Sequence, residues 1–465
     1  MKRILNIETT KYLEQRVKVS GWVNSIRSHG KIVFIDLRDR SGILQLVCSS
    51  EIAKEVRQEW VVEAIGKISK RPSKMVNPKL ETGQIELAVE NLKVLSKAKT
   101  LPFSIEGDGY EINEEKRMKY RYLDLRRGRL RKNLLMRQKV IQFMREFLLK
   151  EGFLEVETPI LTKSTPEGAR DFIVPSRLQP GKFYALPQSP QQYKQLLQVA
   201  GIERYFQIAR CFRDEDPRAD RQAEFTQLDI EMSFIDQSEI LDLIERLFIT
   251  VVKNLFPEKR IQKIPFPRLP YSKVIEKYQS DKPDLRINKN NPDELAFVFV
   301  VNFPMFEWKK EEKRWDAVHH PFTRPQIEDI KEIKKNPEKI LAYQYDLVLN
   351  GYEIGGGSLR SFRPEMLEAV FEVMGHKKSE IRQKFGHLLE AFEYGVPPHG
   401  GIAPGIDRFM AILLNEPNIR EVIAFPKTGD SRDLMMAAPS EVSKEQLKEL
   451  KIKIVPRTSP RVQKK

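Results

Sequence analysis

The chain has 465 residues, 40% of them hydrophobic, so it is long enough for more than one domain with its own core. Lys and Arg outnumber Asp and Glu by 80 to 65, and the net charge of +15 favours a polyanionic partner, nucleic acid above all, although a merely soluble basic protein would share this balance. With only two cysteines, Cys48 and Cys211, a disulfide framework or a thiolate metal site is not expected. No run is apolar enough to span a membrane and the first residues lack the apolar segment of a signal peptide, so we expect a cytoplasmic protein without a membrane partner.

Residues 1–95 are expected to form a small domain of β-strands. Five runs with strand character are separated by Gly, Asp and Ser turns, namely 17–23, 32–37, 43–47, 61–65 and 85–89. Five short strands favour a Greek-key barrel of the OB type, although another small sandwich would give the same pattern. A short helix is expected near residues 51–59.

The next stretch, residues 96–130, is polar and contains Pro102, so we expect a hinge. From Arg131 apolar residues recur with helical spacing, and Gly152 stands where a C-terminal cap is expected. Residues 131–465 are expected to form the second domain.

Two alternating runs surround a polar loop between residues 204 and 233, and this pattern predicts an antiparallel hairpin. The second run has an apolar face and a polar face, formed by Leu228, Ile230 and Met232 and by Gln227, Asp229 and Glu231. We expect helices to cover the apolar face. Carboxylates within a strand are typical of a functional site, although a solvated face remains the alternative.

The run Phe212-Arg213-Asp214-Glu215, followed by a loop and Phe225-Thr226-Gln227-Leu228-Asp229, resembles motif 2 of class II aminoacyl-tRNA synthetases. The fuller stretch is similar to the aspartyl-tRNA synthetases of bacterial type. The resemblance implies that Arg213 binds the α-phosphate of ATP and the activated carboxylate, and a planar guanidinium suits two anionic oxygens.

The other class II motifs follow the expected order. A helix, a strand and a proline over residues 131–159 resemble motif 1, the dimerisation element, and the glycine-rich residues 400–414 match motif 3. The resemblance implies catalytic roles for Arg213, Glu353 and Arg408. It also implies an ATP site formed by Arg213, Asp214, Glu215, Gln222, Glu353, Gly405, Ile406, Asp407 and Arg408.

Three further segments resemble parts of an aspartate pocket. Residues 162–171 are similar to a flipping loop that closes over the amino acid, residues 188–194 to a segment that holds it, and residues 317–323 to a segment that lines it. Of two adjacent histidines, the resemblance selects His319. The implied aspartate site comprises Glu167, Gln191, Lys194, Arg213, Asp229, His319 and Arg360.

Asn350-Gly351 between two alternating runs predicts a tight hairpin. Val348 should face Glu353, which places Asp346 and Glu353 on one face, about 7–8 Å apart at Cα. Two such carboxylates can share a divalent cation that bridges ATP phosphates, and the resemblance implies Mg²⁺ at these positions.

Simple alternation would place Arg360 on the opposite face from Glu353. We therefore expect a bulge within Gly355–Gly357 that restores Arg360 to the site. These three glycines resemble a phosphate loop, but no Lys-Ser/Thr follows them, which favours the bulge or a close approach of a flat ligand.

One departure from the bacterial pattern concerns the segment between motifs 2 and 3. Bacterial aspartyl enzymes usually carry a large inserted domain there, whereas this chain has only the polar stretch 280–294. The arrangement is more like that of archaeal and eukaryotic relatives. The resemblance otherwise covers nearly the whole chain.

In the N-terminal domain, alternation places Phe34 and Asp36 on one face of a strand, and the acidic residue indicates that this face is wet. An aromatic ring there can stack on an unpaired base, and Gln45 on the next strand can bond a base edge. From the pattern alone, a surface aromatic residue beside a solvated glutamine is about as credible as a base-binding site. The resemblance implies that Phe34 and Gln45 contact the anticodon, and Arg27, in the preceding loop, can add a phosphate contact to this anticodon site.

The sequence thus predicts an α+β protein: a class II synthetase antiparallel sheet flanked by helices, with an N-terminal OB-fold β-barrel, assembled as a homodimer. The implied reaction activates L-aspartate with ATP and transfers it to tRNA-Asp, and charging of tRNA-Asn is left open. ATP and Mg²⁺ are the implied ligands, and DNA is not an expected partner. Two alternatives remain: an asparaginyl or lysyl enzyme of the same subclass, and a catalytically inactive RNA-binding relative.

Overall fold

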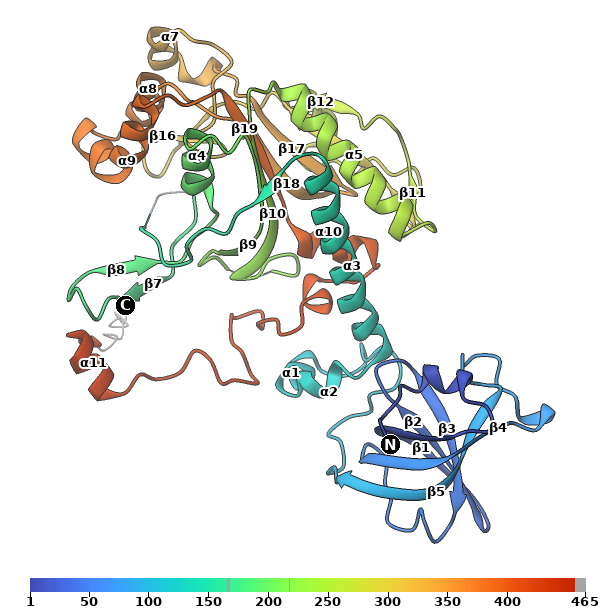
Figure 1. The fold of residues 1–465 in the computed structure, drawn as a ribbon. Coiled ribbons are helices and arrows are strands. Elements are labelled where there is room, and N and C mark those ends of the chain that lie inside the picture. Colours follow the sequence, from blue (N-terminus) through green and yellow to red (C-terminus); the bar gives the residue numbers. More distant parts are fainter. Residues whose placement is uncertain (165–167, 217, 456–465) are drawn as a thin grey trace, which may run out of the picture. The chain divides into compact units, whose positions relative to one another are not determined.

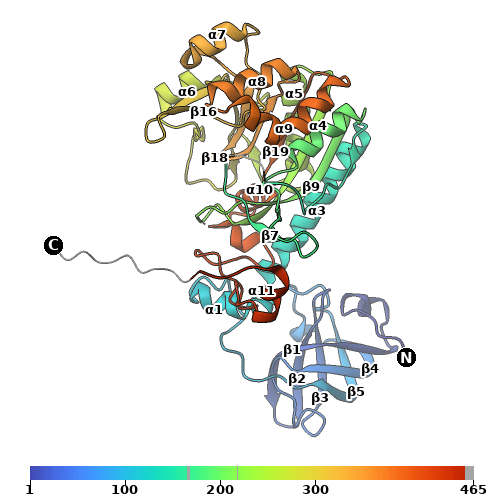
Figure 2. The same ribbon diagram turned by 90° about the vertical axis from the view of Figure 1, so that its left-hand side faces the viewer.

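A computed structural model describes residues 1–164, 168–216 and 218–455. The chain separates into two compact units, residues 1–104 and residues 105–465 (Figures 1 and 2). Among the helices described, none is both long enough and apolar enough to cross a bilayer.

The first unit is a closed five-stranded barrel with the strand order β1-β2-β3-β5-β4. Its elements are η1 (Ile7–Lys11), β1 (Arg16–His29), β2 (Ile32–Arg38), β3 (Ile43–Ser49), β4 (Val61–Lys70), η2 (Ser73–Met75) and β5 (Ile85–Ser96). All five expected strands are present, and the expected barrel is confirmed. Val33 and Ile35 point into the core, whereas Phe34 and Asp36 alternate with them and stay half-buried.

The helix expected near residues 51–59 is wrong, because this segment forms turns. Glu59 has a left-handed backbone with φ of 63°, and its N–H donates to the Val23 carbonyl at 2.7 Å. The end of the segment is therefore hydrogen-bonded to β1. The residues that remain are too few to form a stable isolated helix.

The second unit is built on an eight-stranded sheet with the order β12-β14-β17-β18-β19-β10-β9-β6. In chain order these strands are β6 (Leu154–Glu155), β9 (Arg204–Phe212), β10 (Glu224–Ser233), β12 (Arg268–Pro270), β14 (Phe297–Val301), β17 (Gln344–Leu349), β18 (Tyr352–Leu359) and β19 (His399–Pro404). Only the outermost pairs, β12 with β14 and β6 with β9, are parallel. The expected, mostly antiparallel sheet is confirmed.

Three small two-stranded sheets lie outside the main one. They are β7 (Ile173–Pro175) with β8 (Phe183–Ala185), β11 (Arg260–Ile261) with β13 (Glu294–Leu295), and β15 (Phe306–Lys309) with β16 (Arg314–Ala317).

Helices cover both faces of the main sheet (Figure 1). The described helical segments of this unit are α1 (Glu114–Lys119), α2 (Arg121–Asp124), α3 (Gly128–Lys150), α4 (Gln191–Val199), α5 (Gln237–Leu255), α6 (Tyr271–Tyr278), α7 (Ile330–Lys335), η3 (Pro337–Lys339), α8 (Pro364–Val373), α9 (Lys378–Glu393), α10 (Ile406–Leu413), η4 (Ile419–Val422) and α11 (Lys444–Leu450). One core cluster joins α3, α5 and α10 to the apolar side of β9 and β10, including Leu228, Ile230 and Met232. A second cluster joins α7, α8 and α9.

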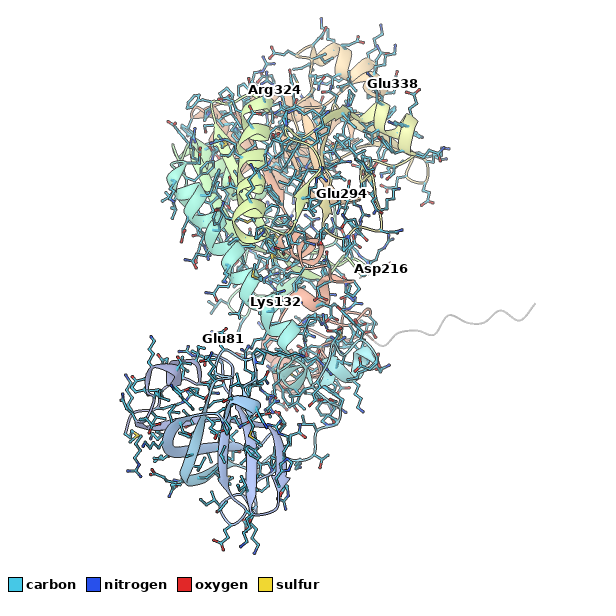
Figure 3. The ribbon with its side chains drawn as sticks, turned by 90° about the vertical axis from the view of Figure 1, so that its right-hand side faces the viewer. Glu81, Lys132, Asp216, Glu294, Arg324 and Glu338 are labelled. Carbon is cyan, nitrogen blue, oxygen red and sulfur yellow. The ribbon has the colours of Figure 1, made fainter. Side chains whose placement is uncertain are left out.

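The long helix α3 ends where the sequence predicts a cap. Gly152 has φ of +82°, and the N–H groups of Gly152 and Phe153 donate back to the carbonyls of the last turn. Figure 3 labels Lys132 near the beginning of this helix. Two short helices, α1 and α2, lie within the stretch expected as a hinge, residues 96–130.

Candidate active site

The polar face of the main sheet borders a cavity of about 360 Å³. Of the residues expected to bind ATP or aspartate, the cavity is lined by Gln191, Lys194, Arg213, Glu215, Gln222, Asp229, His319, Glu353, Arg360, Gly405, Asp407 and Arg408. Five segments far apart in the sequence therefore converge on one space.

Three expected residues do not line this cavity or cannot be placed. Ile406 belongs to the apolar core, and Asp214 lies beside the cavity, where its N–H donates to the Arg170 carbonyl at 3.0 Å. Glu167 lies outside the described residues. Their expected ligand contacts stay predictions.

The predicted hairpin of β9 and β10 is confirmed and supports one wall. Asp229 pairs with Gln207 and Glu231 with Tyr205, so both carboxylates share the polar face. Arg213 follows β9 directly, and its N–H donates to the Ala223 carbonyl at 2.8 Å.

The Arg213 guanidinium rests on an aromatic ring, with Cζ 5.1 Å from the centre of Phe225. Across the described part of the chain, its side chain is engaged in no hydrogen bond or ion pair. A half-buried cation with uncommitted donors suits an incoming anion.

Lys194, Asp229 and Arg360 of the lining form a buried quartet with Glu231, which does not itself line the cavity. Arg360 and Lys194 are each only 2% exposed. Arg360 binds Glu231 through two bonds, from Nε to Oε1 at 2.8 Å and from Nη2 to Oε2 at 3.0 Å. Lys194 Nζ donates to Asp229 Oδ2 at 3.0 Å and lies 3.3 Å from Glu231 Oε2. The four charges balance, which makes their burial tolerable.

The quartet treats its two carboxylates differently. Burial on its own would raise the pKa of Glu231, but Arg360 and Lys194 outweigh it and lower the pKa to about 2. Burial raises the pKa of Asp229 despite the opposing effect of Lys194. Asp229 Oδ1 is buried and has no hydrogen-bond partner among the described residues, so it is an acceptor available to a ligand's N–H group.

Two N–H donors of the quartet remain for a ligand. Arg360 Nη1 donates to Ser358 Oγ at 2.6 Å and to His320 Nε2 at 2.8 Å, while Nε and one N–H of Nη2 serve Glu231. Lys194 uses two of its three N–H groups on Asp229 and Glu231. Within residues 1–164, 168–216 and 218–455, one N–H on each cation is therefore uncommitted.

Both adjacent histidines line the cavity, although sequence reasoning selected only His319. His320 Nε2 accepts from Arg360, so this nitrogen carries no proton. Burial, followed by the charge of Arg360, lowers the pKa of His319 to about 3. Burial likewise lowers the pKa of His320 well below its ordinary value, so both rings are neutral.

Glu231 and His320 were not predicted as site residues, yet both contact the predicted substrate-binding residue Arg360. For Glu231 the sequence did contain an indication, because alternation placed it on the same strand face as Asp229. No local pattern pointed to His320.

The Asn350-Gly351 hairpin has the predicted register, with Val348 opposite Glu353. A bulge is present, but its predicted location within Gly355–Gly357 is wrong. Ile354 is the extra residue between the pairs Val348–Glu353 and Leu347–Gly355. After it, Gly356 is opposite Asp346, so Arg360 returns to the face of the site.

Gly356 leaves a small space between the two carboxylates expected to bind metal. A Cβ at this position would lie 3.2 Å from Asp346 Oδ1 and 3.6 Å from Glu353 Oε1, so both oxygens flank one point. Within the described residues, no group of three or more His, Cys, Asp or Glu side chains could hold a metal. Two carboxylates nevertheless fit an ion that takes its other oxygen ligands from phosphates and water.

The electrostatics of this pair also favour a cation. Burial, followed by repulsion from Glu353, raises the pKa of Asp346 well above its ordinary value. Burial opposes ionisation of Glu353 as well, but Lys282 and Arg408 lower its pKa. A divalent ion would relieve the repulsion.

Arg408 lies in the first turn of α10, beside this pair. Its Nη1 donates to the Glu353 carbonyl at 2.8 Å, and its Nη2 lies 3.1 Å from Asp220 Oδ2 in the motif 2 loop. The carboxylate of Asp407 accepts the Thr226 N–H at 3.0 Å and an N–H of Arg137, so it fastens α10 to the sheet.

Gly356→Ala is expected to raise the Mg²⁺ concentration needed for half-maximal activity about tenfold, as loss of a supporting contact around a metal ligand typically does. The new methyl group would meet His319 Cε1 at 3.1 Å and Asp346 Oδ1 at 3.2 Å and must displace them. The measurement is ATP–pyrophosphate exchange over a Mg²⁺ titration.

Gly386→Ala, on α9, is the control for this substitution, because a Cβ there meets no atom within 4 Å. An unchanged Mg²⁺ requirement in Gly356→Ala would contradict the assignment of Asp346 and Glu353.

The barrel unit carries a separate polar face. Arg27 lies opposite Phe34 across β1 and β2 and binds Asp36 through two bonds of 2.9 and 3.1 Å. Gln45 lies opposite Asp36, accepts from Arg27 at 3.4 Å and donates to Glu86 Oε2 at 2.9 Å. The three residues expected at the anticodon are therefore neighbours, although Arg27 lies in a strand and the loop location was wrong.

Arg71 and Glu86 join this face without having been expected. Arg71 Nε donates to the Ile85 carbonyl at 2.8 Å, and its buried Nη2 has no hydrogen-bond partner in the part of the chain that the structure describes. Burial lowers the pKa of Arg71 despite the opposing charge of Glu86. A buried donor without a partner marks a point where a ligand acceptor could bind.

Comparison with known families shows which family the chain belongs to. A family model described as tRNA synthetases class II (D, K and N) matches residues 113–429, and one described as an OB-fold nucleic acid binding domain matches residues 17–95. The chain belongs to the class II tRNA synthetases. It is therefore a ligase of the family that uses ATP as a substrate and tRNA as a partner.

Curated relatives match this synthetase over nearly its whole length. The aspartate–tRNA(Asp/Asn) ligase of Dictyoglomus turgidum is 43% identical over 96% of this chain and 96% of its own, and that of Syntrophomonas wolfei is 42% identical over 95% and 97%. The first alignment spans 574 positions although this synthetase has 465 residues, so the relative contains residues that this chain lacks. The shortened segment 280–294 agrees with this difference.

Solved structures share the fold at low identity. An aspartyl-tRNA synthetase from Leishmania major superimposes with a TM-score of 0.73 at 20% identity, covering 91% of this chain and 94% of its own. An asparaginyl-tRNA synthetase from Pyrococcus horikoshii gives 0.71 at 24% identity, covering 90% and 96%.

Proposed function

We propose that this synthetase activates L-aspartate with ATP to aspartyl-adenylate and transfers the aspartyl group to tRNA-Asp. The observation that carries the proposal is the uncommitted N–H on each of the two buried cations, Arg360 and Lys194, in a cavity that Arg213 and Arg408 also line. The names of the curated relatives, aspartate–tRNA(Asp/Asn) ligases, support the same substrate.

The quartet favours aspartate over the substrates of sibling enzymes. A carboxylate offers two acceptor oxygens to the free N–H groups of Lys194 and Arg360, whereas an asparagine amide would turn an N–H group towards one of them. A lysine side chain would meet two like charges. Asp229 Oδ1, which has no partner, can accept from the substrate's ammonium group.

The first step needs positioned charges and no protein nucleophile. An α-carboxylate oxygen of aspartate attacks the α-phosphorus of ATP, the bond to the β-phosphate breaks, and pyrophosphate leaves. Arg213 stabilises the charge that develops between carboxylate and α-phosphate, and Arg408 holds the γ-phosphate. Asp346 and Glu353 would hold Mg²⁺, which supplies neutralisation of the phosphates. In the second step a hydroxyl of the terminal tRNA ribose attacks the carbonyl, and AMP leaves.

The test is amino-acid-dependent ATP–pyrophosphate exchange with aspartate, asparagine and lysine in parallel. Exchange with aspartate alone is expected. Preferred exchange with asparagine or lysine would assign the enzyme to a sibling activity, and absence of exchange with all three would favour a catalytically inactive protein.

We also propose a homodimer formed through motif 1. Several large apolar side chains of α3 and the following segment are about half exposed, namely Leu135, Leu149, Leu154 and Leu161. A second copy would cover them. Sedimentation of the purified protein measures the assembly state, and a monomer at micromolar concentration would refute it. The cytoplasmic location stays a prediction.

The barrel is proposed to read the anticodon through Phe34, Gln45 and Arg27. Support comes from the half-buried ring of Phe34, which is free to stack on a base, and from the polar groups beside it. His29, the last residue of β1, contacts the Phe34 ring edge to face, with 5.8 Å between the ring centres. That position makes His29 the residue to vary when charging of tRNA-Asn is measured.

Phe34→Ala and Gln45→Ala are each expected to lower charging of tRNA-Asp by about 10- to 100-fold. For Phe34 the reason is a lost stacking contact, which typically costs about 1–3 kcal/mol, and for Gln45 it is a lost hydrogen bond to a base edge. Pyrophosphate exchange without tRNA should stay unchanged in both variants. Trp22→Ala is the control, because Trp22 is an exposed aromatic residue of β1 that lies opposite Arg38, away from the pair Arg27 and Phe34. Equal losses in both assays would mean that Phe34 and Gln45 maintain the fold instead.

A further inference from the structure

The loop between α6 and β13 has no part in the reaction described above. It contains the polar stretch 280–294 and leads into β13 at Glu294, which Figure 3 labels. The loop is fastened to its surroundings at two points: Gln262 Nε2 donates to the Leu285 carbonyl at 2.7 Å, and the Ile287 N–H donates to Glu294 Oε1 at 2.8 Å. Within the loop, Arg286 pairs with Asp284 at 2.7 Å. A loop held in this way presents its other side chains in defined positions.

Lys282 is the residue of this loop that reaches the proposed metal ligands. Its Nζ lies 3.2 Å from Glu353 Oε2, and the two side chains are 32% and 31% exposed. The other oxygen, Oε1, flanks the space above Gly356 together with Asp346. An ammonium group thus neutralises the carboxylate that a divalent cation would need.

The loop also lies against the hairpin that carries Glu353. A Cβ on Gly351 would lie 3.4 Å from Asp284 Cβ and 3.9 Å from the Lys282 carbonyl. The backbone of Lys282 is therefore close to the turn between β17 and β18, whereas its four-carbon side chain can reorient.

We propose that Lys282 is a place-holding cation: it neutralises Glu353 before ATP binds, and its ammonium group then passes to the nucleotide's phosphates as Glu353 binds the divalent cation. This inference rests on the proposed function. Metal binding frees Lys282 for a phosphate, and phosphate binding frees Glu353 for the metal. Each ligand therefore strengthens binding of the other, and such coupling is reciprocal.

Binding of Mn²⁺ to the nucleotide-free enzyme, followed by electron paramagnetic resonance, tests the first half of the exchange. Lys282→Gln is expected to bind Mn²⁺ about three- to tenfold tighter than the wild type, the modest range reflecting solvent screening of a partly exposed pair. Lys282→Arg keeps the charge and should retain wild-type affinity. Lys289→Gln, which removes the same charge from an exposed position of the loop, should do likewise.

Calorimetry of a non-hydrolysable ATP analogue, with and without Mn²⁺, tests the second half. The gain in analogue affinity caused by Mn²⁺ should be several-fold smaller in Lys282→Gln than in the wild type. The complex of metal and analogue in solution is the same for every variant, so it cancels in this comparison. Lys282→Met, which keeps the aliphatic stem, repeats both measurements if the glutamine variant melts at a lower temperature.

Unchanged Mn²⁺ affinity in both Lys282→Gln and Lys282→Met would overturn the inference. A gain in Mn²⁺ affinity in Lys289→Gln equal to that in Lys282→Gln would also overturn it, because it would show a general effect of the net charge. Aspartate-dependent exchange by the wild type in the same preparation reports on the proposed function separately. Exchange without a Mn²⁺ effect contradicts only the role of Lys282, whereas a Mn²⁺ effect without exchange contradicts only the reaction.

Discussion

Arg213→Ala is expected to lower the rate of aspartyl-adenylate formation by about two to three orders of magnitude, the typical cost of removing a donor that stabilises transition-state charge. Arg213 lines the cavity on the ring of Phe225, and its side chain is committed to no ion pair among the described residues. Its loss therefore leaves no buried charge behind, and the melting temperature should change little.

The measurement is aspartate-dependent ATP–pyrophosphate exchange beside a thermal melt. Arg210→Ala is the matched control, because Arg210 is an exposed arginine of the same hairpin that pairs with Thr226 and Glu224 outside the cavity. Near-normal exchange in Arg213→Ala, or an equal loss in Arg210→Ala, would refute the role of Arg213.

Arg360→Leu is expected to impair both folding and aspartate activation. Arg360 is buried and binds Glu231 through two bonds, so leucine would strand a carboxylate in the interior at a cost of about 3–5 kcal/mol. From sequence alone we expect this substitution to affect activation far more than stability. In the structure Arg360 has two roles: it neutralises the buried Glu231, and it offers an N–H group to the substrate. The single substitution therefore cannot separate an effect on stability from an effect on activation.

Two further variants separate these effects. The double variant Arg360→Leu/Glu231→Leu removes both charges and should recover much of the lost stability, since buried pairs replaced by apolar residues are often neutral. It should still fail to activate aspartate. Arg360→Lys keeps the charge but loses the planar fork, and aspartate kcat/KM should fall about 10- to 100-fold, as hydrogen bonds to charged groups contribute roughly 1.5–3 kcal/mol. Recovery of aspartate selectivity in the double variant would contradict the assignment.

The strands and their faces could be predicted because their signals are local. Alternation with a period of two separates Leu228 from Asp229 wherever the strand pairs, and Asn350-Gly351 favours one tight turn wherever the hairpin lies. The same alternation also predicted a bulge. Glu353 and Arg360 are an odd number of positions apart, so without a bulge their side chains would lie on opposite faces of the strand. The position of the bulge, one residue before Gly355, depends on how β17 and β18 pair.

Contacts between distant segments were decided only by the tertiary structure. Arg360 and Glu231 are 129 positions apart, and each finds its partner because β18, β19 and β10 are neighbours in the sheet. The contact of His320 with Arg360 and that of Lys282 with Glu353 have no counterpart in any local pattern.

The failed helix at residues 51–59 has the same origin. Its local composition favours a helix, but the N–H of Glu59 pairs with the Val23 carbonyl across the barrel. The sequence by itself determined the residue types of the site and the faces on which they stand, because these depend on near neighbours. The tertiary structure alone decided which charges meet, because burial forces each buried polar group to find a partner, and that partner is supplied by whichever strand or loop folds beside it.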